Sequence, residues 1–165
     1  MPERTKAVAV RVLILVVCLF ARGKYVEGFA PPPSPGMRVV RLGDVASELA
    51  TALDVSRRVE VVLVPRNDLV VSVEPSPAPE AGYRITFEQQ FFERLNDDEI
   101  SAALAHELGH VWIYSHFPYL QTEALANEIA LKVTPRKTME SLYGKLWAYT
   151  GVKGNIEELL GPEEP

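Results

Sequence analysis

Two histidines and a glutamate form the stretch of this 165-residue chain that is best suited to chemistry. His106, Glu107 and His110 stand in the order His-Glu-x-x-His. On a helix, residues four apart share a face, so both imidazoles can reach one metal ion. Glu107 can then act as general base toward a water held by that ion. All three histidines of the chain, His116 included, fall within eleven positions. We therefore predict a zinc site rather than a surface helix with two incidental histidines.

A third protein ligand is expected, because two histidines alone hold zinc poorly. His116 lies ten residues after the first histidine. That spacing needs the chain to turn at a position where glycine is usual, and Ile113, which resists a positive φ, stands there instead. Glu123 is the preferred candidate, on a predicted helix where Asn127 shares its face. We expect Glu123 to bind the metal and Asn127 to hold a ligating histidine, with His116 as the alternative ligand.

The helix that must carry these histidines is predicted from Asp97 to about Tyr114. Asn96 provides an N-cap, and Glu99 at the third helical position completes a capping box. Gly109 costs about 1 kcal/mol relative to alanine inside a helix. Close passage of a strand or ligand backbone is one reason for a glycine there. Alanines in the following helix should let the two helices approach closely.

A small sheet is predicted ahead of this helix, from three runs rich in β-branched and aromatic residues. These runs are 58–65, 69–73 and 83–87, whereas the proline-rich segment 74–79 should be a loop. We predict an α+β fold with three or four mostly antiparallel strands, packed on the active-site helix and two or three further helices. Other helices are predicted after Asp44, over 120–133, from Pro135 to Gly151, and as a short turn capped by Asn155.

The amino terminus differs from the rest of the chain. Basic residues precede a ten-residue apolar run at 12–21, which is typical of an export signal with cleavage after Gly23. We predict a signal peptide or a retained signal anchor at 1–23, a proline-rich linker at 24–37 and one domain at 38–165. The protein should be exported to the periplasm or the extracellular space, with a membrane tether through residues 7–21 as the alternative. A net charge of −5 argues against a nucleic-acid partner.

Two motifs together resemble a known peptidase family. The run D-D-E-I-x-x-A-L-A-H-E-L-G-H at 97–110, followed by E-x-x-A-N at 123–127, resembles gluzincin metallopeptidases of the HtpX and CAAX-prenyl-protease kind, in peptidase clan MA. The resemblance covers about residues 58–133, and the second motif is also similar to ImmA/IrrE-type peptidases. It implies a zincin-like domain in which His106, His110 and Glu123 bind one zinc ion and Glu107 is the catalytic base.

The chain departs from that family in three ways. Asn127 stands where the family has an aspartate, which removes a negative charge beside a ligating histidine. The several membrane helices of the family are absent. No histidine follows His116 to stabilise an oxyanion, and the candidates to replace one are Tyr143, Tyr149 and Arg136.

The resulting functional prediction is a zinc-dependent endopeptidase that acts on a peptide or protein. An extended substrate is expected to add a strand along the Tyr83–Phe87 edge. The missing oxyanion histidine supports an alternative, a catalytically weak or inactive zinc-binding module of the cell envelope. The remaining hypothesis is a structural protein of the cell envelope in which the His-Glu-x-x-His motif is accidental.

Overall fold

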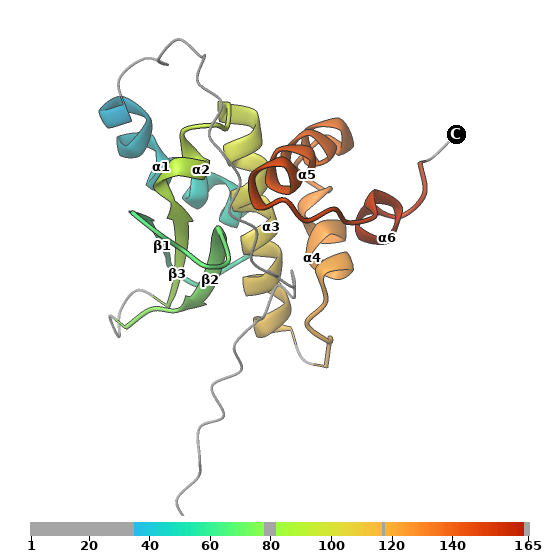
Figure 1. Cartoon of the computed structure of the whole chain (residues 1–165). Helices are drawn as coiled ribbons and strands as arrows, with labels where there is room; N and C mark the ends of the chain where they lie inside the picture. Colours follow the sequence, from blue (N-terminus) through green and yellow to red (C-terminus); the bar gives the residue numbers. More distant parts are fainter. Residues whose placement is uncertain (1–34, 78–81, 117, 164–165) are drawn as a thin grey trace, which may run out of the picture.

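The structure is a computed structural model, and it describes residues 35–77, 82–116 and 118–163 (Figure 1). The predicted signal segment and the linker up to residue 34 lie outside these ranges, and residues 35–37 belong to the first helix. None of the helices in the described part has the length and apolar character needed to cross a membrane. The elements in chain order are α1 (Pro35–Ala52), β1 (Val59–Val64), β2 (Val71–Pro75), β3 (Tyr83–Glu88), α2 (Gln89–Phe92), α3 (Asp97–Ser115), α4 (Glu123–Ala130), α5 (Arg136–Thr150) and α6 (Ile156–Leu160).

The three strands form one mixed sheet in the order β1-β3-β2. β1 runs parallel to β3, with Val59 opposite Tyr83, and β2 runs antiparallel to β3, with Val71 opposite Phe87. The predicted α+β class is confirmed, with one parallel and one antiparallel strand pair. The sheet is not mostly antiparallel, because β3 follows β2 in the chain but inserts between β2 and β1.

β3 lies at the centre of this sheet and has a hydrogen-bonded neighbour on each side. The prediction that substrate adds along the Tyr83–Phe87 edge is therefore wrong, because these residues form no free edge. The outer strands are β1 and β2. β2 also continues to Pro75, in a segment predicted to be a loop. An edge strand tolerates proline there because one side of its backbone makes no ladder hydrogen bonds.

α3 is the central helix of the fold, and Figure 1 shows it between the sheet and helices α4–α6. The predicted capping box is present at its start. Asn96 accepts a hydrogen bond from the Glu99 backbone N–H at 2.9 Å, and the Glu99 side chain accepts one from the Asn96 N–H at 2.7 Å. Ten consecutive residues, 102–111, are buried. α3 thus presents its histidines from a rigid, deeply packed support.

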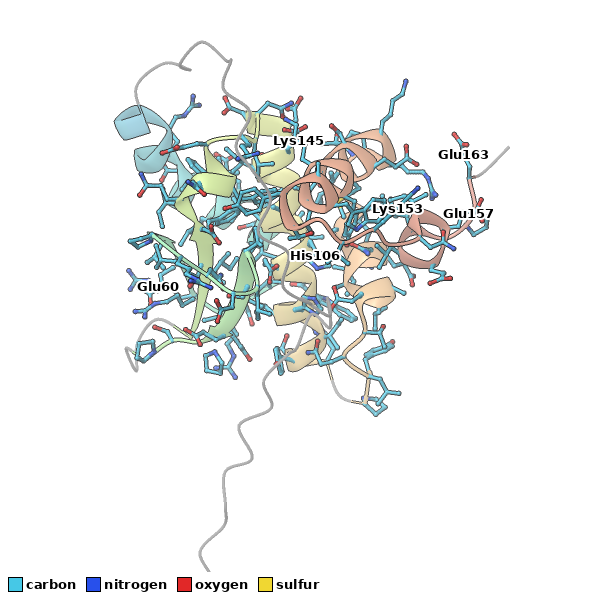
Figure 2. The ribbon with its side chains drawn as sticks, in the orientation of Figure 1. Glu60, His106, Lys145, Lys153, Glu157 and Glu163 are labelled. Atoms are coloured by element: carbon cyan, nitrogen blue, oxygen red, sulfur yellow. The ribbon has the colours of Figure 1, made fainter. Side chains whose placement is uncertain are left out.

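Glu99 also joins α3 to α5. Its side chain is 2% exposed, and it accepts hydrogen bonds from Ser141 at 2.8 Å and from the Lys145 ammonium at 2.6 Å. Burial alone would raise the pKa of Glu99, but the bonds from Lys145, Asn96 and Ser141 outweigh it and lower the pKa below its ordinary value. Figure 2 shows Lys145 beside the upper part of α3 and His106 near the middle of that helix.

α3 and α4 approach each other closely at Gly109. A Cβ atom at this position would lie 2.5 Å from the carbonyl oxygen of Ala126 and 3.0 Å from its Cα. The glycine therefore allows a backbone to pass, as predicted, but the backbone is that of helix α4 and not of a strand or a ligand. This contact brings the first turn of α4 next to the histidines of α3.

Candidate metal centre

His106, His110 and Glu123 meet where α3 faces the start of α4. The Nε2 atom of His106 lies 3.2 Å from one carboxylate oxygen of Glu123, and the Nε2 atom of His110 lies 3.6 Å from the other. The ligand atoms of the three residues all lie within 4.8 Å of one another. Atoms about 2.1 Å from a tetrahedral zinc ion lie about 3.4 Å apart. These three residues, called the metal cluster below, are therefore compatible with one bound metal ion.

Glu123 reaches the cluster because it is the first residue of α4. The side chain of Thr122 caps this helix and accepts a hydrogen bond from the Leu125 backbone N–H at 3.2 Å. A Thr cap satisfies one of the N–H groups that a helix start leaves without a partner. The cap thus sets the point at which the helix begins and aims the Glu123 carboxylate at the two imidazoles.

Asn127 holds the ring of His106. Its side-chain oxygen lies 2.7 Å from His106 Nδ1 and also accepts a hydrogen bond from the Tyr143 hydroxyl at 2.8 Å. Its amide nitrogen donates to the Leu159 carbonyl at 3.0 Å, which determines the orientation of the amide. An amide oxygen only accepts, so His106 Nδ1 carries a proton. The unprotonated Nε2 atom then faces Glu123, on the side where a metal ion would bind.

His110 is 1% exposed, and its Nδ1 atom lies 3.1 Å from the side-chain oxygen of Gln121. Its Nε2 atom has no hydrogen-bond partner, and no other buried side-chain nitrogen or oxygen in the described part of the chain lacks one. Leaving a buried polar atom without a partner costs about 1–3 kcal/mol. A bound cation would remove this cost. Two imidazoles and one carboxylate also form a donor set that zinc accepts, with a fourth position left for substrate.

The two carboxylates beside the histidines differ in electrostatic environment. Burial, helped by the charge of Glu123, raises the pKa of Glu107 above its ordinary value, although the two histidines oppose this shift. Burial also acts to raise the pKa of Glu123, but the neighbouring imidazoles of His106 and His110 outweigh it and hold this pKa far below the usual range. Glu123 is therefore ionised at neutral pH, as a ligand must be. Glu107, whose pKa is shifted upward, is the better proton acceptor of the two carboxylates.

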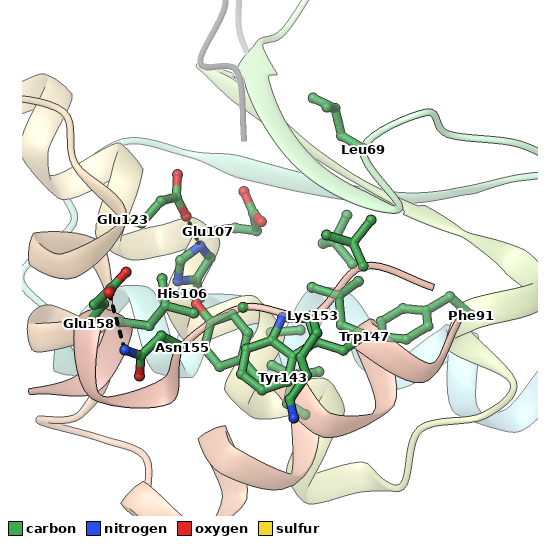
Figure 3. Close-up of a pocket in the computed structure, with 17 residues that line it drawn as sticks. Leu69, Phe91, His106, Glu107, Glu123, Tyr143, Trp147, Lys153, Asn155 and Glu158 are labelled. Atoms are coloured by element: carbon green, nitrogen blue, oxygen red, sulfur yellow. Dashed lines mark hydrogen bonds and ion pairs between the residues drawn. The ribbon is translucent and has the colours of Figure 1, made fainter. Parts of the chain in front are cut away.

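A cavity of about 390 Å³ opens beside this cluster. Figure 3 shows the carboxylates of Glu107 and Glu123 next to the His106 ring at one side of it. Much of its remaining wall is apolar and comes from the segment around β2 and from α5: Leu69, Val71, Leu142, Leu146 and Trp147. The cavity thus connects a buried carboxylate to a space suited to an apolar side chain.

The alternative third ligand, His116, does not join the cluster. Its ring stacks on Trp112, with 3.9 Å between centroids, and its Nδ1 atom lies 2.8 Å from the Trp112 carbonyl oxygen. Among the described residues, the group that could hold a metal contains Glu123 and not His116. The reason is that α3 continues through position 113 to Ser115 instead of turning earlier.

Of the three residues considered for oxyanion stabilisation, Tyr143 alone lines the cavity. Its hydroxyl donates to Asn127. The Tyr149 hydroxyl instead donates to Glu88, and the Arg136 guanidinium binds backbone carbonyls near the end of α6. Tyr149 and Arg136 therefore have structural roles outside the cavity.

Gln121 is the residue at this centre that sequence reasoning missed. It belongs to the connection between α3 and α4, where no helical spacing links it to a histidine. Its side-chain oxygen lies within hydrogen-bond distance of His110 Nδ1, and its amide nitrogen donates to the His110 carbonyl oxygen at 3.2 Å. The only signal in the sequence is its place two residues before Glu123.

Comparison with known proteins gives one structural likeness. No family model matches the sequence, and no curated protein matches it. A solved structure that does match is the metallopeptidase zymogen abylysin of Pyrococcus abyssi, which is 18% identical. The match covers 69% of the present chain and 99% of the abylysin chain, with a TM-score of 0.49. What the present chain does therefore has to follow from the side chains of its own site.

Proposed function

We propose that this protein is a zinc-dependent metallopeptidase that hydrolyses internal peptide bonds. The observation that supports this function is that His106, His110 and Glu123 lie together next to the buried carboxylate of Glu107. Within this group, the buried Nε2 atom of His110 has no hydrogen-bond partner. One zinc ion held by the first three residues would supply a Lewis acid that activates a water molecule and polarises a substrate carbonyl.

Glu107 performs the proton transfers in this proposal. It removes a proton from the attacking water, whose oxygen forms a bond to the carbonyl carbon of the peptide. The carbon–nitrogen bond then breaks, and Glu107 passes the same proton to the leaving amine. The raised pKa of Glu107 suits both steps, because the carboxyl group must accept a proton and release it at similar pH.

Among the described residues, no strand pairs with the outer side of β2, and this edge is the proposed place for the substrate backbone. Val71 of this edge strand lines the cavity together with Glu107. An extended peptide that pairs with β2 would pass the metal cluster and direct a large apolar side chain into the cavity. The substrate is then a peptide or an exposed segment of a protein. Export through the amino-terminal segment, which lies outside the described residues, is part of this proposal.

A specific observation favours a second candidate, a catalytically weak or inactive zinc-binding module of the cell envelope. Tyr143 is the oxyanion candidate that lies at the cavity, and its hydroxyl is engaged by Asn127. If Tyr143 keeps this contact when a substrate binds, its hydroxyl cannot also stabilise the oxyanion.

Substitution of Glu107 distinguishes these functions. We expect the wild-type protein to cleave members of a quenched-fluorescence peptide library, and we expect a chelator to abolish the cleavage. Glu107→Gln should retain one zinc ion per chain and lose activity by about 10²- to 10⁴-fold, the usual contribution of a general base. Glu128→Gln, at an exposed glutamate of α4, is the matched control and should change nothing. Equal turnover in wild type and Glu107→Gln contradicts the mechanism, and zinc binding without turnover favours the inactive module.

A further inference from the structure

The contacts of Gln121 with His110 are reciprocal. The side-chain oxygen of Gln121 lies 3.1 Å from His110 Nδ1, and its amide nitrogen donates to the His110 backbone carbonyl at 3.2 Å. The second bond determines which end of the amide faces the ring, because only the NH₂ group can donate to a carbonyl. Gln121 therefore presents an atom to Nδ1 that accepts hydrogen bonds and cannot donate them.

This arrangement selects one tautomer of the neutral His110 ring. A proton on Nδ1 makes a hydrogen bond with Gln121 at 3.1 Å. A proton on Nε2 would face the Glu123 carboxylate at 3.6 Å, which is too long for an effective hydrogen bond, and would leave Gln121 without its donor. The Nδ1–H form is thus favoured, and it leaves the Nε2 lone pair free to bind a metal ion.

We propose that Gln121 is a positioning residue that holds His110 as its Nδ1–H tautomer, and that the connection before α4 thereby prepares the second histidine for metal binding. This inference rests on the metal site of the proposed function and adds to it the residue that orients His110.

Chain order makes this arrangement compact. Gln121 orients one histidine, the next residue, Thr122, caps α4, and Glu123 supplies the carboxylate. Three consecutive residues thus supply an acceptor for His110, the start of a helix and a candidate ligand. A displacement of this segment would disturb both the His110 ring and the carboxylate that faces it.

A first experiment measures the tautomer directly in the wild-type protein. Long-range ¹H–¹⁵N correlation spectra of the metal-free protein distinguish Nδ1–H from Nε2–H imidazole by their nitrogen shifts. We expect His110 in the Nδ1–H form. Observation of the Nε2–H form in wild type overturns the inference, whatever the variants do.

A second experiment measures zinc affinity by competition with a fluorescent chelator. Loss of a hydrogen-bond partner of a metal-binding histidine typically weakens metal affinity about 10- to 100-fold, and we expect this for Gln121→Leu. Gln121→Glu retains an acceptor for Nδ1 and should bind zinc as tightly as wild type or more tightly. Leu120→Gln, at the neighbouring side chain that is 78% exposed, is the control and should leave affinity unchanged.

The outcomes separate this inference from the proposed function. Failure of the wild type to bind zinc contradicts the proposed function, while the tautomer measurement still tests the role of Gln121. Tight zinc binding by wild type and Gln121→Leu alike contradicts the inference and leaves the proposed function standing. Circular dichroism of the metal-free variants confirms folding, and if Gln121→Leu does not fold, the wild-type spectrum decides alone.

Discussion

Two buried polar clusters lie along α3, and they are completed in different ways. The Glu99 cluster consists of Glu99, Asn96, Ser141 and Lys145, and both carboxylate oxygens of Glu99 accept hydrogen bonds from the other three residues. The metal cluster is formed by His106, His110 and Glu123, and it leaves the Nε2 atom of His110 without a partner. Both clusters join α3 to a later helix, but only the metal cluster contains a buried nitrogen without a hydrogen-bond partner.

The difference indicates what each cluster is for. A buried polar group without a partner costs free energy, so most are paired within the fold. The Glu99 cluster follows this rule, and we expect its effect to be confined to stability. The metal cluster departs from the rule at one nitrogen, at the position where a cation would supply the missing interaction.

The largest expected effect is that of metal on the metal cluster. Zinc at a free concentration about 1,000 times its dissociation constant should raise the free energy of unfolding by about 4.1 kcal/mol, because it binds the folded state. Thermal unfolding with and without a chelator measures this shift. Glu123→Gln should lose most of the shift, whereas Lys145→Met should retain it. A shift of equal size in Glu123→Gln would contradict the assignment of Glu123 as a ligand.

Gly109→Ala should affect the metal cluster more than the Glu99 cluster. The added methyl group would meet the Ala126 backbone at 2.5 Å and force α4 away from α3. We expect a loss of about 3 kcal/mol, at the upper end for overpacking, together with weaker zinc binding. Gly144→Ala in helix α5 is the control. An added Cβ there would meet no group of another described segment within 4 Å, so the substitution should stabilise by about 1 kcal/mol. Denaturant unfolding and zinc titration of both variants make the comparison.

Lys145→Met should destabilise the fold by about 2 kcal/mol and leave the proposed peptidase activity unchanged. The substitution leaves the Glu99 carboxylate buried with one fewer donor, while the metal cluster lies a full turn or more further along α3. Lys137→Met, at an exposed lysine of the same helix, should change stability by less than about 0.5 kcal/mol. Loss of activity in Lys145→Met at temperatures where it remains folded would show that the two clusters are not independent.

The smallest effect concerns acid stability. The pKa of Glu99 is lowered in the folded state, so its contribution to stability is complete above the unfolded pKa of about 4.3 and is lost as pH falls through the folded value. The free energy of unfolding should therefore decrease more steeply with falling pH in wild type than in Glu99→Gln. The comparison uses metal-free protein, so that Glu123 and the histidines contribute equally to both curves. Identical acid limbs would mean that Glu99 carries no net pKa shift.

Local signals in the sequence were sufficient for the centre of the molecule. The capping box at Asn96 predicted the start of α3, and the four-residue spacing of the histidines placed them on one face. The same spacing between Glu123 and Asn127 predicted that both face the histidines, and the structure brings them there. These features depend on residues within one or two helical turns, where the chain geometry is known in advance.

Features that depend on distant segments were not predictable in the same way. The order β1-β3-β2 pairs Val59 with the distant Tyr83 in a parallel arrangement, and the sequence, from which we predicted mostly antiparallel strands, carries no local signal for that pairing. Gln121 reaches His110 only because the connection before α4 folds back on α3, and no periodic pattern marks such a residue. The position of Tyr143 beside Asn127 likewise depends on how α5 packs.

The hydrogen bonds from Arg136 to the end of α6 have a practical consequence for protein engineering. Its guanidinium donates to the carbonyls of Leu160, Gly161 and Pro162, while the Leu159 carbonyl accepts from Asn127. The last helix is thereby tied to the amide that orients His106. Affinity tags and reporter fusions should accordingly be attached beyond Pro162. Truncation before Leu159 should weaken zinc binding even though His106, His110 and Glu123 all remain in the chain.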